Sequence, residues 1–187
     1  SYSQKMKILF FASDMDGGFG GKDIWYSTYD ALSDTWKTPV NLGPRVNSIG
    51  DEMFPFIDED GVLYFSSNGH PGMGGLDLFK WKFNALSDAK VENLRYPFNS
   101  NRDDFGIIFQ GAQSGYLTSN REGGLGSDDI YRFNSIDYVT SEKEAPSKSE
   151  LKNALEGVSK LVNNGICEEQ PTLPKISELK VYPNPND

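Results

Sequence analysis

An internal repeat of roughly 50 residues constrains this chain more than any other feature. Residues 9–25 recur as residues 63–79 and again as residues 115–131, with no gap inside any copy. Each copy runs from an apolar stretch through a Gly-rich loop to an aspartate, an aliphatic residue and an aromatic one. The connecting segment repeats as well, at residues 47–54 and 99–106. A period of this kind predicts similar units that bury their apolar faces against one another.

Each copy has the pattern of short β-strands, with aromatic and aliphatic runs bounded by Gly, Asn, Asp and Pro. We expect an Asp58–Gly61 hairpin turn, because Gly adopts positive φ without steric cost. The first copy lacks a recognisable leading strand. The predicted strands are 7–12, 23–29 and 36–42, then 53–57 and 62–67, and finally 105–109, 116–119 and 129–133, with an outer strand at 137–140.

Four short strands in each unit of about 50 residues are typical of a β-propeller blade. The predicted fold is therefore all-β, with about three four-stranded blades over residues 1–140. Closed propellers have about four to eight blades, so we expect the chain to be part of a larger propeller. The alternative is an open three-blade array that exposes two sheet faces to a partner.

The chain changes character after the repeats. Residues 141–148 are polar and predict a linker, and residues 166–187 predict an extended tail. Between them, residues 149–165 carry apolar side chains at helical spacing, which predicts an amphipathic helix. This helix packs either on the flank of the blades or on another subunit.

Composition excludes several classes of function. The chain has 18 basic and 27 acidic residues and a formal charge of −9, which is unfavourable for binding nucleic-acid phosphates. One Cys and one His cannot form an internal disulfide or an ordinary zinc site. No apolar run approaches the roughly 18 residues that a transmembrane helix requires.

The repeats resemble a known family. The motifs are a Ser-Asp step, a Gly-Gly-x-Gly-Gly-x-Asp-Ile-aromatic loop, a Trp-x-x-Pro-x-Asn-Leu-Gly segment at residues 36–43 and Asn-Ser-x-x-Asp-Glu at residues 47–52. They resemble the TolB-like, WD-type propeller repeats that precede OmpA-like domains in Bacteroidota envelope proteins. The resemblance covers residues 7–133 and implies a non-enzymatic module for protein contacts, in the periplasm, at the outer membrane or at the cell surface. The implied partners are an envelope protein, further blades or another subunit.

A second resemblance lies in the tail. Residues 179–185, with the sequence LKVYPNP, resemble the opening strand of the C-terminal sorting domain read by the type IX secretion system. This similarity implies export across the outer membrane, followed by attachment to the cell surface or release.

The Gly-rich loops allow two interpretations. One is calcium binding through loop carbonyls and flanking carboxylates, because calcium prefers six to eight oxygen ligands. The candidate ligands are Asp14, Asp16, Asp23, Asp128 and Asp129. No other cofactor is indicated.

The other interpretation is structural. Asp23, Asp77 and Asp129 then cap the loops by accepting hydrogen bonds from loop amides. The glycines adopt positive φ, so replacing Gly20 or Gly74 with Ala is expected to cost about 1 kcal/mol or more.

Four side chains are candidates for partner contacts: Trp81, His70, Phe19 and Met73. Trp81 has no counterpart in the other copies, which favours a surface contact, and His70 is expected to be an exposed loop residue. Trp25, Phe79 and Tyr131 occupy equivalent positions and are expected in the core between units.

Catalysis is not expected. The chain has no G-x-S-x-G motif. Its paired carboxylates, Asp51/Glu52 and Asp103/Asp104, recur in successive copies, which favours a structural role because an active site is normally built once. The alternative function is a surface propeller that binds or cleaves carbohydrate.

Overall fold

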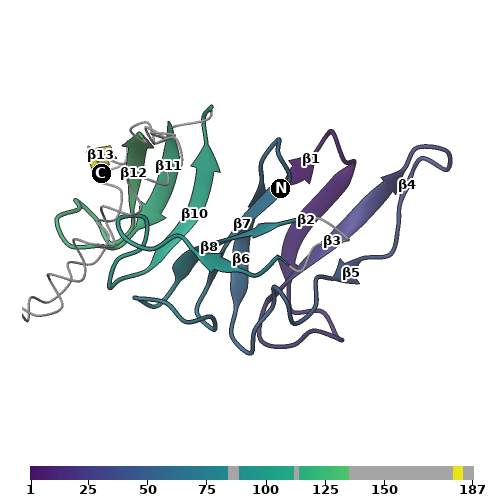
Figure 1. Ribbon diagram of the computed structural model, residues 1–187, viewed down its shortest axis with the longest axis horizontal. Coiled ribbons are helices and arrows are strands. Elements are labelled where there is room, and N and C mark those ends of the chain that lie inside the picture. The colour runs from purple at the N-terminus through teal and green to yellow at the C-terminus, as the bar shows by residue number, and fades with distance from the viewer. Residues whose placement is uncertain (84–88, 112–113, 135–178, 183–187) are drawn as a thin grey trace, which may run out of the picture.

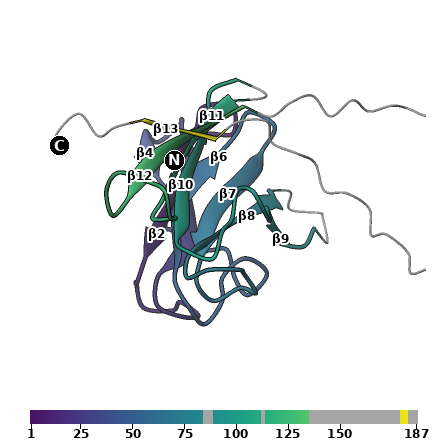
Figure 2. The ribbon, with the colours of Figure 1, turned by 90° about the vertical axis from the view of Figure 1, so that its left-hand side faces the viewer.

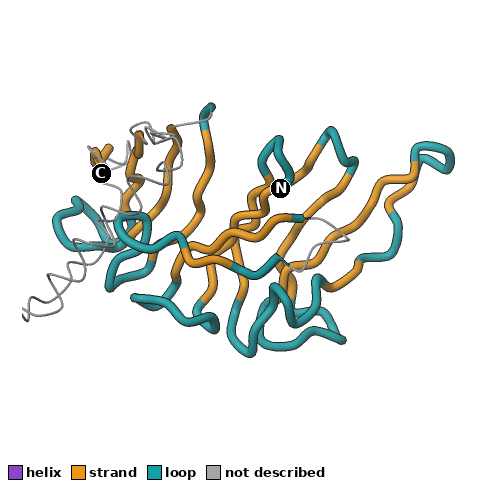
Figure 3. The backbone as a smooth tube through the Cα atoms, viewed as in Figure 1, coloured by secondary structure: helices purple, strands orange, loops and turns teal. Residues whose placement is uncertain are grey.

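The computed structural model describes residues 1–83, 89–111, 114–134 and 179–182. These residues form three antiparallel sheets joined by loops, and they include no helix (Figures 1 and 3). The all-β prediction is therefore confirmed. The predicted linker 141–148, helix 149–165 and strand 137–140 lie outside the described residues.

The first sheet has the order β1 (Tyr2–Ser3), β2 (Ile8–Ser13), β3 (Asp23–Asp30) and β4 (Thr35–Trp36), and β5 (Val40–Asn41) also pairs with β3. β1 corrects the expectation that the first copy has no leading strand. The strand predicted at 36–42 is instead the two short strands β4 and β5. Between them lies Pro39, which has no N–H to donate to a sheet.

The second sheet follows the same plan, with β6 (Glu52–Ile57), β7 (Val62–Ser67), β8 (Asp77–Lys82) and β9 (Glu92–Asn93) in that order. The predicted turn before β7 is confirmed, since Gly61 has φ +77° and the Val62 N–H donates to Asp58 Oδ1. β6 contains a bulge where Phe54 has φ +55°.

The third sheet has the order β10 (Asp104–Phe109), β11 (Ser114–Ser119), β12 (Asp129–Asn134) and β13 (Leu179–Tyr182). A bulge recurs in β10, where Gly106 with φ +65° replaces the phenylalanine of β6. β13 comes from the predicted tail and pairs antiparallel with β12, Tyr131 facing Val181 (Figure 2). The fourth strand of this sheet is thus supplied from far along the chain.

The three sheets pack in series (Figure 1). β6 lies along β2, and β10 lies along β6 and β7, so each leading strand contacts the preceding sheet. Two cores fill the spaces between sheets. The first contains Ile8, Phe10, Ile24, Val46, Ile57, Leu63, Phe65, Phe79 and Trp81, and the second contains Leu78, Ile107, Leu117, Tyr131 and Phe133.

Burial of these side chains is the main stabilising term, because each sheet alone would leave an apolar face in water. The expected positions of Phe79 and Tyr131 in the cores between units are confirmed. Trp25 is buried but belongs to neither core, and its Nε1 donates to the Ser13 carbonyl (3.2 Å). None of the described residues forms a helix capable of crossing a bilayer.

Candidate functional site

The candidate site is the row of Gly-rich loops at one end of the sheets. Loop 1 (residues 14–22) joins β2 to β3, loop 2 (68–76) joins β7 to β8, and loop 3 (120–128) joins β11 to β12. Because these loops connect equivalent strands, they leave the three sheets at the same end (Figure 1).

A buried aspartate fixes each loop from inside. Asp23 Oδ2 accepts from the Phe19 N–H (2.6 Å), Asp77 Oδ2 from the Met73 and Gly74 N–H groups (both 2.9 Å), and Asp129 Oδ2 from the Leu125 N–H (2.7 Å). The structural role predicted for these three aspartates is confirmed. Burial raises the pKa of Asp77, against the effect of its amide hydrogen bonds.

The calcium interpretation gains no support from this geometry. The carboxylates of Asp23 and Asp129 are engaged with loop amides, while Asp14, Asp16 and Asp128 are exposed. Within the described part of the chain, no three His, Cys, Asp or Glu side chains are grouped so that they could hold a metal ion.

The role predicted for Gly20 and Gly74 requires a correction. Positive φ occurs instead at Gly17 and Gly123. Gly20 and Gly74 are needed because backbone from the next unit approaches them closely. A Cβ on Gly20 would lie 2.6 Å from the Ile49 carbonyl carbon, and one on Gly74 would lie 2.8 Å from that of Arg102.

Each loop presents one large apolar side chain to solvent at its tip. Phe19 is 50% exposed, Met73 51% and Leu125 70%, and the three occupy equivalent positions in the repeat. The N–H group of each is the one that the capping aspartate binds. The tips are therefore apolar groups held on a fixed backbone. Phe19 and Met73 were indicated by the sequence, whereas Leu125 was missed although the repeat alignment contains it.

Trp81 is not a surface residue, which corrects the expectation for it. Its side chain is 8% exposed, belongs to the first core and donates from Nε1 to the Ala89 carbonyl (3.0 Å). Its ring packs edge-on against Phe83. The structure also shows a counterpart in the third unit, because Phe133 at the equivalent position is buried in the second core.

His70 is half-buried rather than exposed, so that expectation is also corrected. Its ring lies against Phe65 and Phe79, and Nε2 is 2.7 Å from the Val46 carbonyl oxygen. It therefore joins the second unit to the chain leaving the first.

Arg121 performs the same task between the second and third units, although no sequence motif predicts this role. Its guanidinium donates to the carbonyls of Pro97 and Phe98, lies over the Tyr131 ring and forms a 2.5 Å ion pair with buried Asp104. Phe98 is the repeat equivalent of Val46, so His70 and Arg121 reach the same carbonyl in successive units.

Two segments join the sheets: connector 1 (residues 43–51) and connector 2 (residues 95–103). An aspartate in each binds the loop of the preceding unit. The Lys22 N–H donates to Asp51 Oδ1 and the Leu76 N–H to Asp103 Oδ1, both at 2.8 Å. The following residue adds a backbone bond, from the Glu52 N–H to the Lys22 carbonyl (2.6 Å) and from the Asp104 N–H to that of Leu76 (2.7 Å).

The second acid of each pair is buried beneath its connector. Glu52 accepts hydrogen bonds from the Ser48 N–H and from the hydroxyls of Ser48 and Ser67. Asp104 accepts from the N–H and hydroxyl of Ser100 and from Arg121. The structural interpretation of the paired carboxylates is thereby confirmed.

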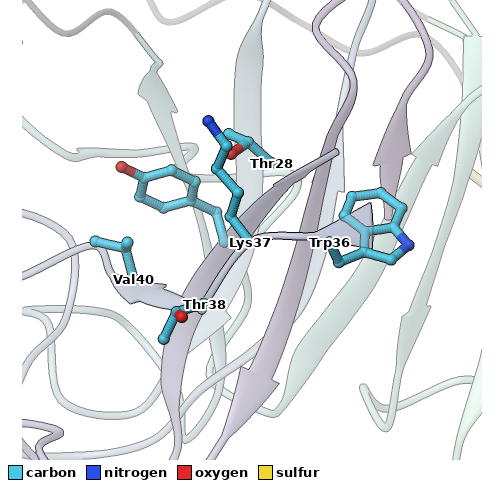
Figure 4. Close-up of a pocket in the computed structure, with 6 residues that line it drawn as sticks. Thr28, Trp36, Lys37, Thr38 and Val40 are labelled. Atoms are coloured by element: carbon cyan, nitrogen blue, oxygen red, sulfur yellow. The ribbon is translucent and has the colours of Figure 1, made fainter. Parts of the chain in front are cut away.

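An open hollow of about 520 Å³ lies on the first sheet and is lined by Tyr26, Thr28, Trp36, Lys37, Thr38 and Val40 (Figure 4). The Lys37 amine lies beside Thr28, while the Trp36 ring points to the other side of the strand. Trp36 is half-exposed and packs edge-on against Tyr29 and Tyr2. The hollow offers an aromatic edge and polar groups but contains no acid pair for glycoside hydrolysis.

No protein-family model matches the sequence, and a search of curated proteins found no match.

Proposed function

We propose that this chain is a set of β-propeller blades serving as a non-enzymatic protein-interaction or scaffold module. Three features support the propeller assignment: the recurring antiparallel sheet of four or five short strands, the packing of units in series and the recurrence of the same connector contacts. The resemblance to TolB-like repeats supports a location in a Gram-negative envelope as part of this proposal. The similarity of residues 179–185 to a sorting segment favours export by the type IX system, although residues 179–182 also pair with β12.

The row of loop tips carries the functional proposal. Exposed apolar side chains cost little singly, but a repeated and rigidly held set is typical of a protein contact surface. Phe19, Met73 and Leu125 present this surface, and the buried aspartates preorganise it. A preorganised surface loses less conformational entropy when a partner binds.

Site-specific photo-crosslinking in the producing cells tests this surface. Probes at residues 19, 73 and 125 are expected to capture one common envelope protein, and a probe at fully exposed Leu32 is the matched control. Serine at all three tips should then weaken binding of the purified partner by about tenfold or more without changing thermal unfolding. A partner captured equally from residue 32, or unaffected by the serines, would refute the proposal.

Carbohydrate binding at the cell surface is the second candidate, and the hollow lined by Tyr26, Thr28 and Lys37 favours it. Aromatic edges next to hydroxyl and amine groups suit sugar rings, whose faces are apolar and whose rims are polar. Glycan-array binding that Lys37→Ala abolishes, with the tip variant unaffected, would favour this function over the scaffold role.

A further inference from the structure

The third unit has the parts of a connector-binding site but, among the described residues, no connector. Loops 1 and 2 each bind the connector that follows them. Asp128 is the repeat equivalent of Lys22 and Leu76, yet within the described ranges its N–H and carbonyl form no hydrogen bond. We call Gly126, Ser127, Asp128 and Ile130 the loop 3 face.

Burial shows the same difference. Ile24 and Leu78 are completely buried beneath their connectors, whereas the equivalent Ile130 is 52% exposed. The Ile24 and Leu78 N–H groups donate to Asn47 Oδ1 and Asn99 Oδ1, the asparagines that hold the connectors in place. The loop 3 face therefore combines an exposed aliphatic side chain with the N–H and carbonyl of Asp128, which form no hydrogen bond to any residue that the structure describes.

Gly126 retains the space that a connector needs. At the equivalent Gly20 and Gly74, a Cβ would collide with connector backbone, whereas at Gly126 the nearest described atom, an Asp129 carboxylate oxygen, is 3.7 Å away. A glycine at this position is required only when another chain segment approaches it. Its presence in the third unit leaves open the space that such a segment would occupy.

The residue after this glycine determines whether a connector aspartate fits against the loop. A Cβ on Gly21 would lie 3.1 Å from the Asp51 Cγ and closer still to its Oδ1, and Gly75 stands in the same relation to Asp103. The third unit has Ser127 at this position and adds the negative Asp128 beside it. A connector aspartate placed as Asp51 and Asp103 are would collide with the Ser127 side chain and would be repelled by the negative charge of Asp128.

We propose that the loop 3 face binds one further connector-type segment, an extended stretch leading into a β-strand, with a small uncharged residue where the internal connectors have aspartate. This rests on the proposed blade architecture and is independent of the loop tips. The segment would supply a carbonyl to the Asp128 N–H, an N–H to the Asp128 carbonyl and apolar cover for Ile130. Ser127 thereby discriminates against the chain's own connectors, so this face does not recruit another copy through them.

Amide hydrogen exchange in the full chain tests whether the face is free. The Asp128 amide should exchange at least about tenfold faster than the amides of Lys22 and Leu76, which are hydrogen-bonded to connectors. Protection of Asp128 at all protein concentrations would assign the face to another part of this chain. Protection that grows with concentration would assign it to a second copy. Either result overturns the proposal.

A peptide swap tests the specificity. The probes are synthetic peptides of residues 94–110, one natural and one with Asp103→Ser, titrated into the full chain by NMR. The serine peptide should shift the signals of the loop 3 face and bind about tenfold more tightly than the natural peptide.

Two variants of the protein test the same contact. Gly126→Ala should abolish binding without altering thermal unfolding, and Ser127→Gly should restore binding of the natural peptide. No shift at the loop 3 face, equal binding of the two peptides, or unchanged binding by Gly126→Ala would overturn the assignment. The loop-tip crosslinking would be unaffected by any of these results.

Discussion

Asn47 pairs with the backbone of Ile24 as a neighbouring strand would. Asn47 Oδ1 accepts from the Ile24 N–H at 2.8 Å and Nδ2 donates to the Ile24 carbonyl at 3.1 Å. Asn99 makes the same pair with Leu78, at 2.7 and 2.9 Å. Both asparagines are buried, so each connector is fixed by a side-chain amide that imitates a peptide group.

Replacing Asn47 with Ala should therefore destabilise the protein strongly. The Ile24 N–H and carbonyl would be left buried without these partners, which costs about 2 to 4 kcal/mol of unfolding free energy. Urea denaturation followed by circular dichroism measures this cost. Asn101→Ala, at an exposed position in connector 2, is the control and should change stability little. A loss at Asn47 no larger than in the control would contradict the assigned role.

The three equivalent glycines should respond differently to alanine. Gly20→Ala and Gly74→Ala force a Cβ against connector backbone and should each cost about 2 kcal/mol or more. Gly126→Ala should stay within about 0.5 kcal/mol, since a Cβ there is accommodated. Thermal and urea unfolding of the three variants measures these changes in unfolding free energy. Equal losses of unfolding free energy at all three positions would show that contact with connector backbone is not the cause.

Removing the Arg121 guanidinium should lower the unfolding free energy, because Asp104 is buried and loses its ion-pair partner. Arg121→Met leaves that carboxylate buried without its ion-pair partner, so we expect a loss of about 3 to 5 kcal/mol. Arg102→Met is the matched control. Its ion pair with Glu122 is exposed and is expected to contribute less than about 1 kcal/mol. Similar losses in the two variants would contradict this account.

Tyr64 should remain protonated at unusually high pH. Burial, with Asp58 nearby, raises the pKa of Tyr64 from 10.0 to about 12. Since the fold favours the neutral phenol, this stabilisation is fully present below pH 10 and is lost as the pH rises towards 12. Ultraviolet titration at the tyrosinate band, compared with Tyr64→Phe, should reveal one late-titrating phenol. A phenol at position 64 that titrates near pH 10 would refute the burial effect.

The contribution of Asp77 to the unfolding free energy should fall as the pH rises. This is the opposite of the pH dependence expected for a carboxylate in an ordinary ion pair. Burial raises the pKa of Asp77 above 3.8, so its stabilising contribution is present below that pH and declines as the pH rises through the raised value. Asp77→Asn keeps an oxygen for the Met73 and Gly74 amides but cannot ionise. The unfolding free energy of Asp77→Asn, relative to the natural protein, should therefore increase from pH 3 towards pH 6. A decrease over that range would show that the amide hydrogen bonds outweigh burial.

Much of the fold could be predicted because its signals are local and repeated. Apolar runs bounded by turn-forming residues located β2, β3, β6, β7, β10, β11 and β12, and the Asp–aliphatic–aromatic step located the loop caps. The repeat also contains the loop-tip position, so Leu125 is as predictable from the sequence as Phe19 and Met73.

Tertiary structure decided which side chains are covered and which segments meet. Trp81 and His70 were assigned to the surface from local context, but burial depends on neighbouring sheets that a local pattern does not contain. The pairing of β13 with β12 joins segments far apart in sequence, and the contact of Arg121 with Asp104 crosses between units. The repeat by itself determined the units and their internal hydrogen bonds, because these use residues close together in the chain. Packing between units determined the role of Gly20, Gly74 and Gly126, because only the approach of another backbone distinguishes one glycine from the next.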